Sequence, residues 1–80
     1  MRTDGITLKQ LRSLIAIART GSLTQAAAVL NQTPPTIHSQ IKNLEMGVGQ
    51  PLMARATDGS GFHPTQAGEV LLAAAHRIEA

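Results

Sequence analysis

Apolar residues recur at helical spacing in the first quarter of the chain. One face of a helix would carry Leu8, Leu11, Leu14, Ile15 and Ala18. This spacing is typical of an amphipathic helix. Thr7 and Gln10 fit a capping box at its start, and Gly21 can adopt the positive φ that often ends a helix. The pattern predicts a helix from about residue 8 to residue 20.

Two further helices are predicted after short breaks. Ser22 and Gln25 form a second capping box ahead of small apolar residues, and Asn31 tolerates the left-handed backbone of a tight turn. Thr33 is then positioned to cap a third helix, because the two prolines that follow it fit the first helical turn. Gly47 and Gly49 are expected to end that helix. Two helices joined by a turn this short indicate a helix-turn-helix unit.

The third helix is predicted to have two distinct faces. Its apolar stripe consists of Ile37, Ile41, Leu44 and Val48, and we expect it to face the core. The opposite face carries Pro35, Ser39, Lys42 and Met46, flanked by Thr36, Asn43 and His38. These side chains are mostly small or polar, so the start of the helix could enter a DNA major groove about 12 Å wide.

The remainder of the chain predicts a hairpin and a last helix. Asp58-Gly59 is a strong turn signal between two short segments, and Thr65 can cap the helix that runs to the end of the chain. The apolar stripe of this helix consists of Ala67, Leu71, Ala74, Ala75 and Ile78. We expect it to form a dimer interface, since a terminal helix has little else to bury it against. The predicted fold is mainly α: a three-helix core, a short β-hairpin wing and a dimerising helix.

Composition narrows the possible chemistry. The 80 residues include one phenylalanine and no tryptophan, tyrosine or cysteine, which excludes aromatic base-stacking surfaces, cysteine–zinc sites and thiol nucleophiles. Seven Lys and Arg against five Asp and Glu give a net charge of +2, which is compatible with a nucleic-acid partner. The sequence shows neither a signal peptide nor a long apolar segment, so we expect a cytoplasmic protein.

At this point the motifs resemble a known family. They are Ser22-Leu23-Thr24-Gln25-Ala26-Ala27, Leu30, Thr33-Pro34-Pro35-Thr36-Ile37, Gln40-Ile41-Lys42-Asn43-Leu44-Glu45, Gly49-Gln50-Pro51-Leu52-Met53-Ala54-Arg55 and Thr65-Gln66-Ala67-Gly68. In order and spacing they are similar to the N-terminal domain of LysR-type transcriptional regulators. The resemblance implies a DNA-binding winged helix-turn-helix over residues 1–64 and the start of a linker helix over residues 65–80.

The resemblance also implies partners. The linker helix would pair antiparallel with that of a second copy, and a full-length protein would form higher oligomers. A small-molecule effector would bind only to a C-terminal domain that this chain lacks. Asp58 stands at the hairpin tip where the family commonly has a basic residue, and Pro34 replaces a usual glutamine.

The predicted DNA contacts fall into two groups. Candidates for base edges are Pro35, Thr36, His38, Ser39 and Lys42. Candidates for the DNA backbone are Ser22, Thr24, Thr33, Asn43, Arg55 and Ser60, with Pro34 at the start of the recognition helix, which spans about residues 34–46. For Arg55, the alternative to a phosphate contact is a structural salt bridge to Glu45.

Other functions remain as alternatives. A winged helix can also serve as a protein–protein interaction module, and a charge of +2 is low for a DNA-binding protein. An enzyme is disfavoured because the sequence shows no paired carboxylates, no nucleophile–base pair and no phosphate-binding glycine loop. The separations of His38, His63 and His76 match no metal-ligand motif, so neither a metal nor another cofactor is expected.

Overall fold

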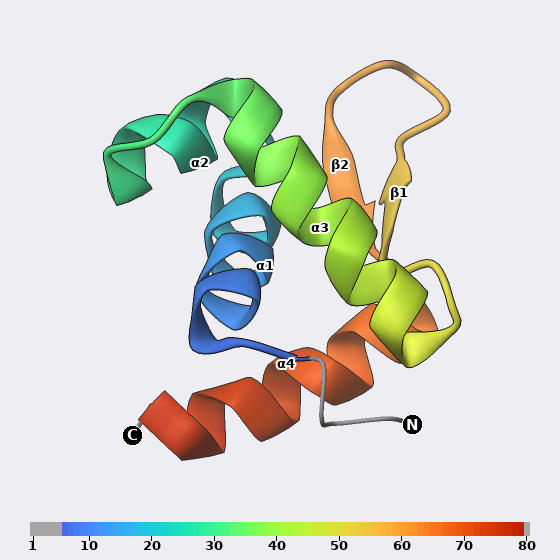
Figure 1. The fold of residues 1–80 in the computed structure, drawn as a ribbon. Coiled ribbons are helices and arrows are strands. Elements are labelled where there is room, and N and C mark those ends of the chain that lie inside the picture. Colours follow the sequence, from blue (N-terminus) through green and yellow to red (C-terminus); the bar gives the residue numbers. More distant parts are fainter. Residues whose placement is uncertain (1–5, 80) are drawn as a thin grey trace.

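The structure is a computed structural model that describes residues 6–79, without the side chains of residues 78 and 79. Over these residues the chain forms α1 (Leu8–Thr20), α2 (Leu23–Leu30), α3 (Pro34–Val48), β1 (Met53–Arg55), β2 (Phe62–Pro64) and α4 (Gln66–Glu79). In Figure 1, α3 crosses in front of α1, the antiparallel hairpin stands beside α3, and α4 passes below α1. The expected winged helix-turn-helix is confirmed.

The boundaries of α1 and α2 follow the local signals. Thr7 Oγ1 accepts a hydrogen bond from Gln10 N at 3.2 Å, and Gln10 Oε1 accepts one from Thr7 N at 3.0 Å, completing the predicted capping box. Gly21 ends α1 with a φ of 71°. Ser22 Oγ accepts from Gln25 N at 3.2 Å, but Ser22 N donates to Thr20 Oγ1 at 3.3 Å and not to the Gln25 side chain, so the second capping box is only half formed. Asn31 ends α2 with a φ of 57°.

The start of α3 differs from the prediction in one detail. Thr33 occupies the N-cap position, but its side chain makes no capping hydrogen bond. Its Oγ1 lies 2.9 Å from Thr36 Oγ1 instead. Pro35 removes the N–H of the second helical position, and the Thr33 hydroxyl pairs with the Thr36 hydroxyl in place of the remaining partner, Thr36 N. The helix includes Gly47 and ends at Gly49, which has a φ of 86°.

A single hydrophobic core lies between the helices and the hairpin. Its fully buried large residues are Leu14, Ile17, Ile37, Leu44 and Leu52. The small residues Ala26 and Ala27 are buried as well, which lets α2 pack closely against α1 and α3. The stripe predicted for α3 therefore faces the core, as its spacing indicated.

The last helix corrects the predicted interface. Leu71 is 6% exposed and Ala75 is 0% exposed within a single chain, so the expectation that these two residues face a second copy is wrong. The reason is that α4 packs against α1 and β2 and completes their core. Ala67 is half-buried against that core and Ala74 is exposed, whereas the side chain of Ile78 lies outside the described residues.

Two glycines allow the close approaches that fix the wing and α4. Phe62 N donates to the carbonyl oxygen of Gly21 at 2.9 Å. A Cβ on the neighbouring residue, Gly61, would overlap this oxygen. A Cβ on Gly68 would overlap the carbonyl oxygen of Leu52. Both contacts are between backbone segments, so neither can be relieved by rotating a side chain.

Candidate nucleic-acid interface

The outer face of α3 presents the predicted contact residues to solvent. The exposed members are Pro35, Thr36, His38, Ser39, Lys42 and Asn43, and Pro34 is half-buried. Because Ile37, Ile41 and Leu44 fill the opposite face, this polar face is fixed toward solvent. The structure brings these α3 candidates together on one surface.

The predicted backbone contacts near α2 are arranged differently. Ser22 is half-buried and its Oγ already accepts from Gln25 N, so its free donor is the hydroxyl hydrogen. Thr24 is exposed in the first turn of α2. Thr33 is exposed beside the start of α3, with its hydroxyl paired to that of Thr36.

A polar groove runs between the start of α1 and α3. It has a volume of about 410 Å³ and is lined by Thr7, Lys9, Gln10, Pro35, Thr36, Ser39, Gln40 and Asn43. The contributions of α1 were missed in the sequence, where Lys9 is simply a polar residue of an amphipathic helix. Only the packing of α1 against α3 places Lys9 at this groove.

The wing carries Arg55 on its first strand and Asp58 at its tip. Arg55 pairs with Phe62 across the hairpin, and its guanidinium carbon lies 4.8 Å from the centre of the Phe62 ring, a cation–π contact. At the tip, Asp58 Oδ1 accepts from Ser60 N at 2.9 Å. Hydrogen bonding from the Ser60 side chain, and next from its backbone N–H, lowers the pKa of Asp58. Ser60 is exposed, but it lies beside a carboxylate that stays ionised.

A hollow of about 240 Å³ separates α3 from the wing. His38 and Lys42 line it from α3, and Arg55 lines it from β1. Glu45 also lines it, but its carboxylate lies 3.6 Å from Lys42 Nζ. The structural alternative for Arg55, a salt bridge to Glu45, is therefore wrong: Glu45 pairs with Lys42, and Arg55 stacks on Phe62.

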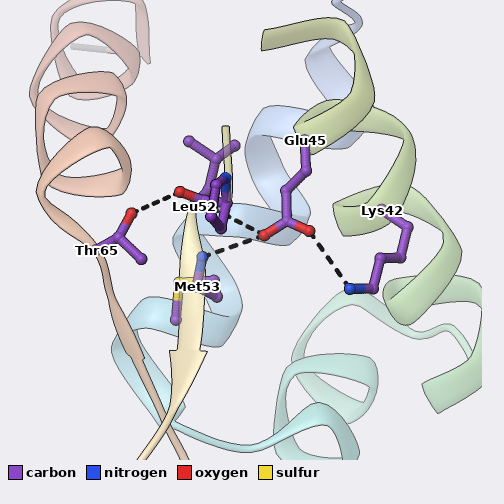
Figure 2. A network of polar contacts seen from close by, with 6 residues as sticks. Lys42, Glu45, Leu52, Met53 and Thr65 are labelled. Carbon is purple, nitrogen blue, oxygen red and sulfur yellow. Dashed lines mark hydrogen bonds and ion pairs between the residues drawn. The ribbon is translucent and has the colours of Figure 1, made fainter. Parts of the chain in front are cut away.

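Glu45 has a second set of contacts that the sequence did not reveal. Its Oε2 accepts from Leu52 N at 2.8 Å and from Met53 N at 3.4 Å (Figure 2). Nearby, Thr65 Oγ1 donates to the carbonyl of Pro51 at 2.7 Å and accepts from Gly68 N at 3.0 Å. The ends of α3, β1 and α4 are thus tied together by side-chain to backbone hydrogen bonds.

The candidate surface as a whole is weakly basic. Lys9, Lys42 and Arg55 provide permanent positive charge, and Glu45 and Asp58 oppose it. Within the part of the chain that the structure describes, no group of three His, Cys, Asp or Glu residues could hold a metal ion. No helix there is long and apolar enough to cross a membrane.

Known proteins resemble this chain over most of its length. The family described as bacterial regulatory helix-turn-helix protein, lysR family, matches residues 8–69. The chain belongs to this family. Among its lysR-family relatives is the HTH-type transcriptional regulator CbbR of Cereibacter sphaeroides, 54% identical over 79 residues, which are 99% of this chain and 26% of the relative. The RuBisCO operon transcriptional regulator of Acidithiobacillus ferrooxidans is 42% identical over 90% of this chain and 23% of its own length.

Solved lysR-family structures share this fold. The CbnR DNA-binding domain in its DNA complex superimposes with a TM-score of 0.82 at 35% identity, covering 90% of this chain and 80% of that one. The BenM DNA-binding domain, complexed with catB site 1 DNA, gives a TM-score of 0.82 at 29% identity, covering 90% and 79%. The chain spans about a quarter of the length of the curated regulators it matches.

Proposed function

We propose that this lysR-family domain binds double-stranded DNA sequence-specifically, with α3 in the major groove. The observation that carries the proposal is the outer face of α3, where exposed hydroxyl, amide, imidazole and ammonium groups stand opposite a fully buried apolar face. The DNA complexes of the CbnR and BenM domains, which share the fold, support it. The domain itself has no proposed catalytic role.

The contacts divide by position. Pro35, Thr36, His38, Ser39 and Lys42 are the proposed base-edge contacts, because they lie on the outer face of α3. The proposed phosphate contacts are Ser22, Thr24, Thr33, Asn43, Arg55 and Ser60, with Lys9 added from the groove between α1 and α3. Their combined charge is small, so uncharged donors and helix N-termini carry much of the phosphate binding.

We propose that dimerisation uses the exposed side of α4. Val70 is 62% exposed, and Ala73 and Ala74 follow at helical spacing on the same outward side. This face replaces the one centred on Leu71, which is committed to the core of its own chain. The domain proper then includes α4 at least as far as Ala75, and the division expected at residue 64 moves toward the C-terminus.

The proposal for the whole protein is transcriptional regulation. Its basis is the family and the names of relatives such as CbbR, of which about a quarter is matched. An effector-binding C-terminal region belongs to the same proposal. The operon named for the Acidithiobacillus ferrooxidans relative provides a first class of promoter DNA to test.

A binding titration tests the DNA proposal. Affinity for duplex DNA is expected to fall with salt, with a log–log slope of about −0.9 per phosphate contacted. Ser39→Glu should weaken binding at least about tenfold, roughly 1.4 kcal/mol, because it places a carboxylate on the α3 face. Val29→Glu is the matched control, since Val29 is 68% exposed and lines a hollow between α1 and α2 instead. Absence of duplex binding at low salt would contradict the proposal.

A further inference from the structure

Glu45 joins the recognition helix to the wing. It lies near the end of α3, yet its side chain is only 14% exposed because it turns back toward β1. There one oxygen accepts from the backbone N–H groups of Leu52 and Met53, at the start of the wing strand (Figure 2). A carboxylate that accepts backbone N–H groups in a partly buried place makes strong, charge-assisted hydrogen bonds. This link therefore holds the wing at a set distance from α3.

The other oxygen of the same carboxylate faces Lys42. The distance from Glu45 Oε1 to Lys42 Nζ is 3.6 Å, and the Lys42 side chain is 60% exposed on the surface proposed to face DNA. An ion pair with one largely exposed partner is weak and is screened by salt. An acceptor atom of the duplex, either a base edge or a phosphate oxygen, can therefore replace Glu45 as the partner of Lys42, whereas the bonds to the wing strand persist.

We propose that Glu45 is a positioning residue that sets the specificity of the domain by controlling Lys42. On DNA of the wrong sequence, α3 does not seat fully, and Lys42 stays paired with Glu45. On the correct sequence, α3 seats in the groove and Lys42 exchanges the carboxylate for the duplex. Glu45 thus withholds one positive charge from nonspecific binding, which otherwise depends almost entirely on such charges. This inference rests on the proposed DNA-binding function.

The experiment is a double-mutant cycle on the chain, measured with a random-sequence duplex and with a duplex selected for binding. Glu45→Gln keeps an oxygen that can accept from Leu52 N but removes the charge that holds Lys42. It should raise affinity for random duplex about three- to tenfold and steepen its salt slope by about 0.9, one additional phosphate contact. Affinity for the selected duplex should change less, so the ratio of the two affinities falls.

Two controls separate this mechanism from a general charge effect. Glu69→Gln removes the same charge from an exposed position on α4 and should leave both affinities and slopes as in the wild type. In a Lys42→Gln background, Glu45→Gln should have no further effect on random-duplex binding.

Glu45→Ala tests the link to the wing. This variant also loses the bonds from Leu52 N and Met53 N, so it should speed hydrogen exchange at the amide of Leu52, whereas Glu45→Gln should not.

The outcomes are distinct. An equal gain in affinity with and without Lys42 would show that Glu45 merely repels DNA and would overturn the proposal. An unchanged salt slope in Glu45→Gln would overturn it too. If the wild-type chain bound no duplex at low salt, the proposed DNA-binding function itself would fail. That failure shows in the wild type without any variant, so it is distinguishable from failure of the Glu45 proposal.

Discussion

The close approach of α4 to the wing strand makes a sharp prediction for Gly68. In a helix, replacing glycine by alanine ordinarily stabilises the fold by roughly 0.5–1 kcal/mol, because alanine loses less conformational entropy. At Gly68, however, a Cβ would overlap the carbonyl oxygen of Leu52 and lie 3.0 Å from its carbon and 3.3 Å from Pro64 Cβ. The first two atoms are backbone, so α4 must move away from β1 to accept the methyl group.

The cost of this movement can be estimated. Overpacking a well-filled site typically costs about 1–3 kcal/mol, which exceeds the helix-propensity gain. Moving α4 would also loosen Leu71 and Ala75, both of which α4 buries in the core. For a domain of this size, about 1 kcal/mol corresponds to a shift in Tm of roughly 4–8 °C. After the helix-propensity gain is subtracted, the net loss is up to about 2.5 kcal/mol, so Gly68→Ala is expected to lower Tm by up to roughly 20 °C.

Gly47→Ala is the matched control, because it makes the same substitution inside α3 where a Cβ would meet nothing within 4 Å. It should raise Tm by roughly 2–8 °C, reflecting helix propensity alone. Thermal unfolding followed by circular dichroism measures both variants. If Gly68→Ala proved as stable as the wild type while Gly47→Ala behaved as expected, the close packing of α4 on Leu52 and Pro64 would be refuted.

Two further predictions concern α4 and the wing. Leu71→Arg should lower the free energy of unfolding by more than about 4 kcal/mol and unfold the domain, because it buries an unpaired charge. Val70→Arg should remain folded, and it should sediment as a monomer if the wild type is dimeric through α4. A folded Leu71→Arg variant, or a dimeric Val70→Arg variant, would contradict these assignments. The hydrogen bonds with Ser60 lower the pKa of Asp58 in the folded state. This carboxylate therefore stabilises the fold at pH values above the pKa it has in the unfolded chain, and the contribution is lost as the pH falls through its folded-state pKa. Asp58→Asn should accordingly be less stable than the wild type at neutral pH, with the gap closing in acid, as measured by urea unfolding at each pH.

The sequence alone determined the helices, the ends of α1 and α2, and the hairpin, whereas α3 runs through Gly47 to Val48, past the predicted end near residue 46. The signals for these features act over at most four residues: the capping box of Thr7 and Gln10, the left-handed Gly21 and Asn31, and the Asp-Gly turn. The spacing of Ile37, Ile41 and Leu44 also settled which face of α3 is outward, because the opposite face is polar. The motif order then pointed to the lysR family.

Only the tertiary structure decided where the remaining side chains lie. The run from Val70 to Ala75 is apolar all around the helix, so periodicity could not choose which side packs on α1, and Leu71 was assigned to the wrong surface. Glu45 illustrates both cases. Its ion pair with Lys42 joins residues three apart on the same helix, so the spacing alone could have indicated it. Its hydrogen bonds from Leu52 N and Met53 N exist only because the chain folds back beside α3, and the sequence pattern does not encode that approach directly.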